Sequence, residues 1–159
     1  MSRKSSRPFR VGRAKTGLGL FATEVIRSGQ TVVEYRGRRI TAEKAAEIER
    51  TGSNRYLFEI NKHWTIDGSS RRNLGRYINH ACKPNAYAVM RRTGKLEFAA
   101  ARRIEPGEEI TLDYGEDYFD LLLAPKGCRC MTCAAKPLRK TYKPGKGKKA
   151  KKKKERKAR

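Results

Sequence analysis

The feature that most constrains the fold of this chain is a series of short runs in which apolar and polar residues alternate. Most runs are four to six residues long, rich in β-branched or aromatic residues, and bounded by Gly, Pro, Asn or Asp. Alternation places every second side chain on one face of a strand, so each run predicts a short β-strand. The runs cover residues 9–11, 18–22, 31–35, 56–60, 64–66, 86–90, 96–100 and 110–114.

Turn and helix signals complete this pattern. Thr93-Gly94 and Glu105-Pro106-Gly107 each predict a hairpin turn. One clear helix is predicted, with Thr41 as its N-cap and an end near Gly52. The helical segments are expected at residues 41–50 and, as single short turns, at 71–77 and 117–123. The fold class is therefore mostly β, with many short strands and little helix.

Length and composition predict one folded domain between two basic segments. A chain of 159 residues suits a single compact domain. Residues 1–8 form a basic arm and residues 137–159 a Lys-rich tail, and we expect both to be disordered because they have little apolar surface to offset the entropy of ordering. No apolar run approaches the ~20 residues that span a bilayer, and the N-terminus lacks the apolar region of a secretory signal. We therefore expect an intracellular protein that does not enter membranes.

The charge of the chain predicts anionic partners. Its formal net charge is +23. Residues 137–159 hold thirteen Lys or Arg against the single Glu155, a net charge of +12, and the first 136 residues are basic as well. Such a surface favours nucleic acid, chromatin or acidic protein faces, with binding that weakens as salt rises. The tail could be a solvated polyanion-binding extension, a nuclear localisation signal, a nucleoid anchor, or a set of substrate lysines.

The four cysteines predict a metal site. Three are clustered as Cys128-Arg129-Cys130-Met131-Thr132-Cys133, and Cys82 is the fourth. In a chain without a secretion signal, such clustering favours a metal over disulfides. Four thiolates with no cysteine left over is the number that a closed structural zinc site requires. A Cys130–Cys133 redox pair and free thiols are the alternatives.

Residues 79–85, Asn-His-Ala-Cys-Lys-Pro-Asn, gather an amide, an imidazole, a thiol and a second amide. Pro84 fixes its own φ and pushes Lys83 towards an extended conformation, so a helix is disfavoured. The stretch predicts a stiff, polar loop of the kind that presents functional side chains. Asn and Pro are also ordinary turn residues, so a purely structural loop is the alternative.

Two other stretches carry weaker signals. Residues 17–22 match the dinucleotide fingerprint G-x-G-x-x-A as a string, but no segment of helical length follows, which disfavours a Rossmann site. Glycines there still allow a ligand to approach the backbone closely.

Asp113-Tyr114-Gly115 ends a predicted strand, where the Tyr114 hydroxyl can point into a cleft. Tyr114, Tyr118 and Phe119 could equally be core residues.

Taken in order, these motifs resemble those of a SET domain followed by a post-SET cysteine cluster, in a compact form similar to small microbial SET proteins. The resemblance covers roughly residues 9–135, with 9–116 as the SET domain and 117–136 as the post-SET segment. It rests on Gly17-x-Gly19, Glu34-Tyr35-x-Gly37, Tyr56-Leu57-Phe58, Arg76-Tyr77-Ile78-Asn79-His80-Ala81-Cys82-x-Pro84-Asn85, Gly107-Glu108-Glu109-Ile110-Thr111-x-Asp113-Tyr114-Gly115 and the cluster at 128–133.

The resemblance implies protein-lysine methylation from S-adenosylmethionine. It implies several small β-sheets and a pseudoknot-like threading of the C-terminal segment, which brings the Asn-His and Asp-Tyr motifs together. By position, cofactor-binding residues would be Gly17, Leu18, Gly19, Arg76, Asn79, His80, Tyr114, Tyr118 and Phe119. The backbone of the glycine stretch would hold the methionine moiety, Asn79 its amine end, His80 the adenine side, and Tyr118 or Phe119 the adenine ring. Tyr35, Tyr56 and Tyr114 would line the channel for the target lysine.

A channel of that kind suits the implied reaction. The methyl donor is a cationic sulfonium, so the acceptor must be a neutral lysine amine in line with the S–CH₃ bond. Aromatic walls and the nearby positive charge both lower the pKa of the lysine. The Tyr114 hydroxyl and strand carbonyls can orient the amine and contact the methyl group.

The sequence departs from the family pattern at two places. The cysteine cluster is C-x-C-x2-C, whereas the common post-SET pattern has four residues in the last gap. Leu112 lies where family members carry Phe or Tyr. A Tyr hydroxyl at that position restricts the product to monomethyl-lysine. Leu112 has no hydroxyl, so the resemblance implies that higher methylation is sterically possible and leaves its degree open.

The resulting hypothesis is a protein-lysine N-methyltransferase with one structural zinc ion. Its substrate would be an exposed lysine of a histone or another basic, DNA-associated protein, and its tail would hold it near DNA or chromatin or be methylated itself. The expected location is the bacterial cytoplasm or nucleoid, or the nucleus of a eukaryotic cell. The alternative is a non-enzymatic DNA- or chromatin-binding protein that retains the SET scaffold.

Overall fold

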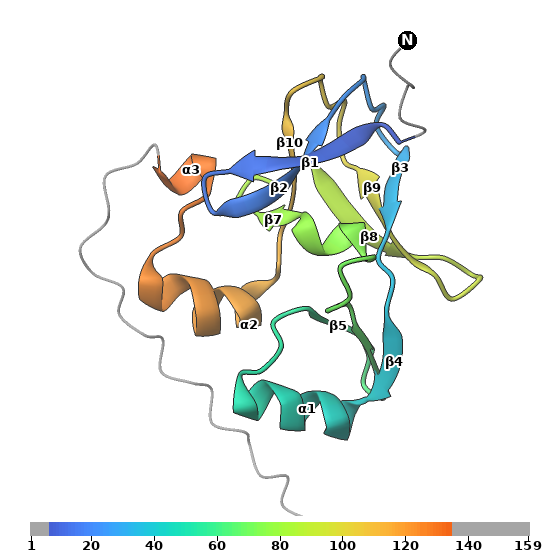
Figure 1. Ribbon diagram of the computed structural model, residues 1–159, viewed down its shortest axis with the longest axis vertical. Coiled ribbons are helices and arrows are strands. Elements are labelled where there is room, and N and C mark those ends of the chain that lie inside the picture. Colours follow the sequence, from blue (N-terminus) through green and yellow to red (C-terminus); the bar gives the residue numbers. More distant parts are fainter. Residues whose placement is uncertain (1–6, 135–159) are drawn as a thin grey trace, which may run out of the picture.

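The computed structural model describes residues 7–134, which form three small β-sheets with short helices between and after them (Figure 1). The first sheet has the strand order β1-β2-β10-β7. Its strands are β1 (Phe9–Ala14), β2 (Gly17–Ala22), β10 (Glu109–Leu112) and β7 (Asn79–His80). Strands β1 and β2 form an antiparallel hairpin, and β10 pairs antiparallel with β2 and parallel with β7. The juxtaposition expected of the Asn-His and Asp-Tyr motifs is therefore present.

The other two sheets are antiparallel and three-stranded, with orders β3-β9-β8 and β4-β6-β5. Their strands are β3 (Thr31–Glu34), β9 (Leu96–Ala100), β8 (Ala86–Met90), β4 (Arg38–Thr41), β6 (Trp64–Asp67) and β5 (Leu57–Asn61). All eight predicted runs are strands, which confirms the mostly β fold. Two strands were not expected. Residues 79–80 of the predicted loop form β7, and β4 buries only Ile40 between polar neighbours.

One of the two predicted hairpin turns is wrong. The Thr93-Gly94 turn joins β8 to β9 as predicted, with Gly94 at φ 78° and its N–H donating to the carbonyl of Arg91. Residues 105–107 do form a turn, in which Glu108 N–H donates to the Glu105 carbonyl. This turn does not join paired strands, because Ile104 bridges to Ile26 whereas β10 pairs with β2 and β7.

Helix α1 (Ala42–Thr51) confirms the predicted helix and both of its ends. The Thr41 side chain accepts a hydrogen bond from Lys44 N–H, and Gly52 ends the helix in the left-handed conformation at φ 63°. The remaining helical segments are η1 (Leu74–Tyr77), α2 (Glu116–Tyr118), η2 (Phe119–Leu123), η3 (Ala124–Lys126) and α3 (Met131–Ala134). The predicted turns near 71–77 and 117–123 are thus helical as well.

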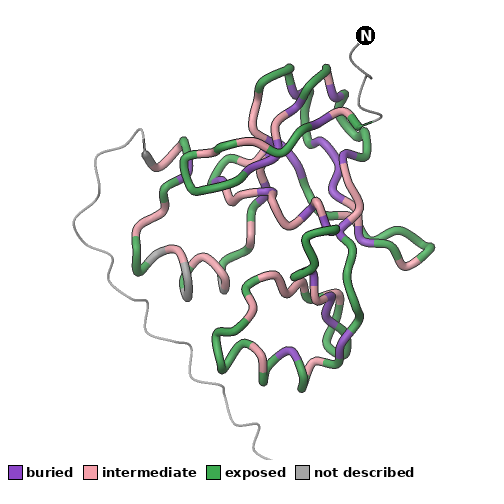
Figure 2. The backbone as a smooth tube through the Cα atoms, in the orientation of Figure 1, coloured by how far each residue is buried: buried purple, intermediate pink, exposed green. Residues whose placement is uncertain are grey.

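The buried core is built mainly from residues of the first two sheets, and purple segments gather around these sheets in Figure 2. Phe98, Leu20, Ile26, Ile104 and Ile110 are its largest fully buried apolar side chains together with Ile78. The sheet of β4, β6 and β5 lies with α1 at the opposite end from the β1–β2 hairpin (Figure 1). Within residues 7–134, no helix is long and apolar enough to cross a membrane. The expected disorder of the arm at residues 1–8 and of the tail lies outside the described residues except at residues 7 and 8, where the carbonyl of Pro8 accepts from Thr23 N–H at 2.9 Å.

Candidate functional site

The centre of the candidate site is the short parallel pairing between β7 and β10. Thr111 lies opposite Asn79 and Leu112 opposite His80. The buried Asn85 holds the loop beyond β7 against the same strand: its amide donates to the Glu109 carbonyl at 2.8 Å, and its Oδ1 accepts from Thr111 N–H at 2.8 Å. Because an amide side chain occupies both backbone groups, a polar loop can lie beside a central strand without leaving buried groups unpaired.

The Asn79 side chain faces the glycine stretch of β2. Its Nδ2 donates to the Leu18 carbonyl at 3.0 Å and to the Glu109 carboxylate at 2.7 Å. A Cβ at Gly19 would lie 2.7 Å from Glu109 Oε1 and 3.2 Å from Asn79 Nδ2. The structure therefore brings the glycine stretch at 17–19 together with Asn79, and a side chain at position 19 would force the Glu109 carboxylate to move. Gly17 has φ 127°, a backbone conformation that also favours glycine.

Gly19→Ala should destabilise the protein, because the new methyl group overlaps the Glu109 carboxylate inside a packed sheet. We expect a loss of roughly 1–3 kcal/mol in the free energy of unfolding, measured by denaturant unfolding. Gly12→Ala on the neighbouring strand is the matched control. Its Cβ mainly meets the movable end of Arg10, with the edge of Phe21 at 3.1 Å, so the loss should be smaller. A larger loss for Gly12→Ala would contradict this account.

His80 connects this centre to the cysteine cluster. Burial lowers the pKa of His80, and the nearby Asp113 carboxylate only partly opposes this. The ring is therefore neutral at pH 7. Its Nδ1 accepts from Tyr114 N–H at 3.3 Å, which places the proton on Nε2, 3.4 Å from Cys82 Sγ. One ring thus contacts both the end of β10 and a cysteine sulfur.

The predicted aromatic residues gather around Tyr114. The ring centroid of Tyr118 lies 4.8 Å from that of Tyr114 in an edge-on arrangement, and His80 lies 5.5 Å from both Tyr114 and Phe119. The Tyr114 hydroxyl donates to the Ile78 carbonyl. Burial raises the pKa of Tyr114 above its ordinary range, so the hydroxyl keeps its proton.

Tyr35 and Tyr56 lie close to each other, but in different surroundings. Tyr35 belongs to the core between Phe58 and Phe98, and its hydroxyl donates to the Tyr56 carbonyl at 2.8 Å. Burial raises the pKa of Tyr35. Both tyrosines help to raise the pKa of Tyr114. Tyr35 thus presents little surface, only 7%, whereas Tyr56 lines an open pocket.

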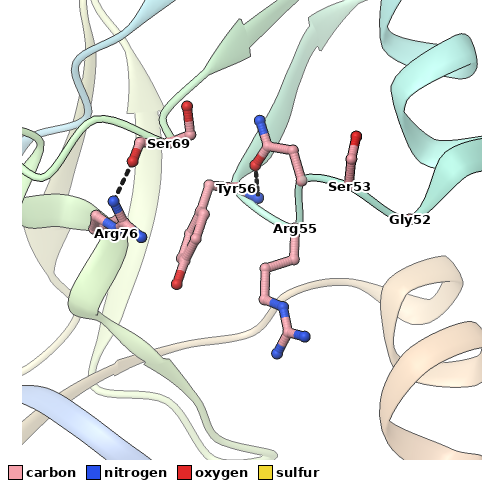
Figure 3. Close-up of a pocket in the computed structure, with 7 residues that line it drawn as sticks. Gly52, Ser53, Arg55, Tyr56, Ser69 and Arg76 are labelled. Carbon is pink, nitrogen blue, oxygen red and sulfur yellow. Dashed lines mark hydrogen bonds between the residues drawn. The ribbon is translucent and has the colours of Figure 1, made fainter.

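That pocket, about 290 Å³ in volume, lies between the end of α1 and η1, and Figure 3 shows its side chains. The Arg76 guanidinium lies 3.9 Å from the centroid of the Tyr56 ring, and it donates to the Ser69 carbonyl. Arg76 Nε is buried without a partner. The pocket is lined by Gly52, Ser53, Asn54, Arg55, Tyr56, Ser69 and Arg76. Sequence reasoning found only Tyr56 and Arg76, because no spacing distinguishes the loop at 52–55 from an ordinary connection.

The four cysteine sulfurs all lie within 4.8 Å of one another. Cys82 Sγ is 3.8 Å from Cys128 Sγ and 3.5 Å from Cys133 Sγ, and none of these described cysteines is in a disulfide. Sulfurs bound tetrahedrally to a zinc ion at ~2.3 Å would be ~3.8 Å apart. The donor set and its spacing fit a metal ion. The short helix α3 carries Cys133 back to the cluster, so the two-residue gap suffices.

The surroundings of the cluster shift the pKa values of individual thiols in opposite directions. Burial and the neighbouring Cys133 and Cys128 thiols raise the pKa of Cys82 above its ordinary range. Burial alone would also raise the pKa of Cys130, but hydrogen bonds from the backbone of Cys82 and Cys133 lower it to about 6. A bound divalent cation would stabilise the thiolate form of all four.

Comparisons with known proteins agree with the sequence motifs. The family model of the SET domain matches residues 17–115. The histone-lysine N-methyltransferase set-2 of Caenorhabditis elegans is 41% identical over 126 residues, covering 71% of this chain and 8% of that protein. The histone-lysine N-methyltransferase trithorax of Drosophila melanogaster is 36% identical over 124 residues, covering 74% and 3%. This chain therefore spans only a small part of these relatives.

A solved structure shares the fold. The Polycomb Repressive Complex 2 of Chaetomium thermophilum, in an autoinhibited conformation bound to S-adenosylmethionine, matches with a TM-score of 0.62 and 29% identity. The match covers 70% of this chain and 15% of that chain. The described architecture is thus that of a known domain in a larger assembly.

Proposed function

Because this chain belongs to the SET domain family, we propose that it transfers a methyl group from S-adenosylmethionine to the side-chain amine of a protein lysine. The observation that carries the proposal is the pairing of β7 with β10. It places Asn79 and His80 beside Tyr114, with the backbone of Leu18 on the other side. Relatives named as histone-lysine methyltransferases and a neighbour bound to S-adenosylmethionine support it.

The residues around this pairing fit the cofactor. S-adenosylmethionine would supply a methyl group on a cationic sulfonium. Gly17, Leu18 and Gly19 would contact its methionine part through their backbone, with Asn79 at the amine end. His80, Tyr114 and the ring of Tyr118 or Phe119 would pack beside the adenosine part. Arg76, with its unpartnered Nε, would provide a positive charge for a carboxylate.

Tyr114, Tyr35 and Tyr56 would act on the lysine. Aromatic walls disfavour a charged ammonium, so the pKa of the entering lysine falls and the neutral amine becomes available. The Tyr114 proton is engaged by the Ile78 carbonyl, which leaves its oxygen lone pairs to accept from the amine. Tyr35 would hold the channel wall through its bond to the Tyr56 carbonyl. These residues orient the amine, and none serves as a general base.

The cysteine cluster would hold one structural zinc ion. Convergence of four sulfurs favours a closed tetrahedral site over a redox pair, which needs only two cysteines. The ion would fix the segment after η3 to the loop at 79–85. It would take no part in the transfer step and would act only by holding this segment beside the loop.

The substrate would be a histone or another basic protein associated with DNA, as the names of the relatives suggest. The tail, with its net charge of +12, would retain the protein on chromatin, or on the nucleoid of a bacterium, through salt-sensitive contacts.

Incubation with S-adenosylmethionine labelled in its methyl group and with core histones tests the proposal. We expect labelled protein and, by calorimetry, binding of the cofactor. A chromatin-binding protein that keeps only the scaffold would give neither. Absence of label on every basic protein tried, together with absence of cofactor binding, would therefore contradict the enzymatic function.

The distribution of lysine supports methylation of the tail itself. Residues 7–134 contain 17 Arg but only 6 Lys, whereas residues 135–159 contain 11 Lys and 3 Arg. Arginine keeps its charge and offers no neutral amine to the donor. In a reaction without added substrate we expect label on the tail, located by peptide mass spectrometry. Replacing these 11 lysines, which are Lys136 and the ten of the tail, by Arg preserves the charge and should abolish that label while leaving histone labelling intact. Unchanged self-labelling would contradict this prediction.

A further inference from the structure

Glu109 stands out among the polar residues of the site because it contacts several of the residues above and has no part in the function as proposed so far. Its Oε1 accepts from Asn79 Nδ2 at 2.7 Å, and its backbone carbonyl accepts from Asn85. The side chain is half-buried beside Gly19. Its negative charge also acts on Tyr114, whose pKa it helps to raise.

The two contacts of the Asn79 amide fix its orientation. Leu18 O and Glu109 Oε1 are both acceptors, so the group facing them must be the NH₂ of Asn79. Both of its protons are then in use. No described residue donates to Asn79 Oδ1, which leaves that oxygen as the free acceptor of the side chain.

We propose that Glu109 is a positioning residue that turns Asn79 Oδ1 towards the cationic amine of the bound cofactor and adds negative charge beside it. The inference rests on the proposed function. Without Glu109, the amide of Asn79 loses its charged partner, and its oxygen and nitrogen can exchange places. A methionine ammonium would then meet a donor in place of an acceptor.

Glu108 provides a matched control from the adjacent position. Its carboxylate forms two hydrogen bonds with Arg102, 3.0 and 3.1 Å long, and accepts from Glu105 N–H on the outer side of the turn. Glu108→Gln therefore removes a charge of the same sign one residue away without touching Asn79.

The test measures binding of two ligands by calorimetry: S-adenosylmethionine, and its analogue that lacks the α-amino group. For Glu109→Ala we expect S-adenosylmethionine to bind roughly 10- to 100-fold more weakly, as for loss of a charged hydrogen bond, with the analogue bound as by the wild type. Glu109→Gln should bind S-adenosylmethionine with an affinity between those of the wild type and Glu109→Ala, because the glutamine carbonyl can still accept but carries no charge. In turnover, KM for S-adenosylmethionine should rise while kcat stays nearly constant.

Equal weakening for both ligands would show that Glu109 only supports the fold and would overturn the proposal, as would unchanged binding of S-adenosylmethionine. If Glu109→Ala does not fold, the affinities of the isosteric Glu109→Gln for the two ligands are compared in its place. A wild type that binds neither ligand would refute the proposed function itself. If the wild type binds S-adenosylmethionine and transfers its methyl group, but the Glu109 variants bind both ligands with equally weakened affinity, only the role of Glu109 is refuted.

Discussion

Cys82→Ser should prevent the cysteine cluster from holding a metal ion and should weaken methyl transfer. The change replaces one of four converging thiolates by a poor zinc ligand. Metal content should fall from about one zinc per chain to well below that. The melting temperature should fall by roughly 10 °C or more, since loss of a structural metal is among the largest single-residue effects.

The rate of methyl transfer should also fall, by roughly tenfold or more, when the metal ion is lost. Cys82 lies two residues beyond the end of β7, whereas the other three cysteines follow the segment that carries Tyr118 and Phe119. Loss of the ion would detach that segment from the aromatic cluster around His80. Metal analysis, thermal unfolding and labelling assays measure the three effects. Lys83→Ser, an exposed neighbour, should change none of them. Full activity without zinc would show that the coupling is wrong.

Tyr114→Phe should abolish most transfer while leaving the fold intact. The variant keeps the ring and its contacts with Tyr118 and His80, but it leaves the Ile78 carbonyl without its donor. We expect a loss of about 1–2 kcal/mol in stability and a fall in kcat of roughly 100-fold or more, because the amine is no longer oriented.

The same change at an exposed tyrosine is the matched control. Tyr87→Phe removes a hydroxyl from an exposed ring on β8 and should leave both stability and kcat unchanged. Calorimetry should show that Tyr114→Phe still binds S-adenosylmethionine. Retention of wild-type kcat by Tyr114→Phe would exclude the proposed role of its hydroxyl.

Much of the fold follows from local patterns in the sequence. Strand β10 was predictable because its alternation of polar and apolar residues records which face is buried, and α1 because Thr41 and Gly52 define its ends. β4 escaped prediction because a single apolar residue, Ile40, lies among Arg and Thr. β7 escaped because two polar residues are a strand only through their pairing with β10.

The site was less predictable than the fold. The order of motifs identified the Asn-His loop and Tyr114, which are more than 30 residues apart, through family resemblance and not through periodicity. Glu109 and Glu108 are indistinguishable as sequence, and only the register of β10 places Glu109 beside Asn79 and Glu108 beside Arg102. The pocket loop that carries Arg55 likewise depends on packing between distant segments.

The most direct measurement is the identity of the atom that receives the methyl group. The wild type and Tyr114→Phe are each incubated with labelled S-adenosylmethionine and histones, and the labelled residues are located by fragment mass spectrometry. We expect methyl groups on lysine side chains with the wild type and almost none with Tyr114→Phe. Label on a residue other than lysine, or equal lysine labelling by the two proteins, would contradict this expectation.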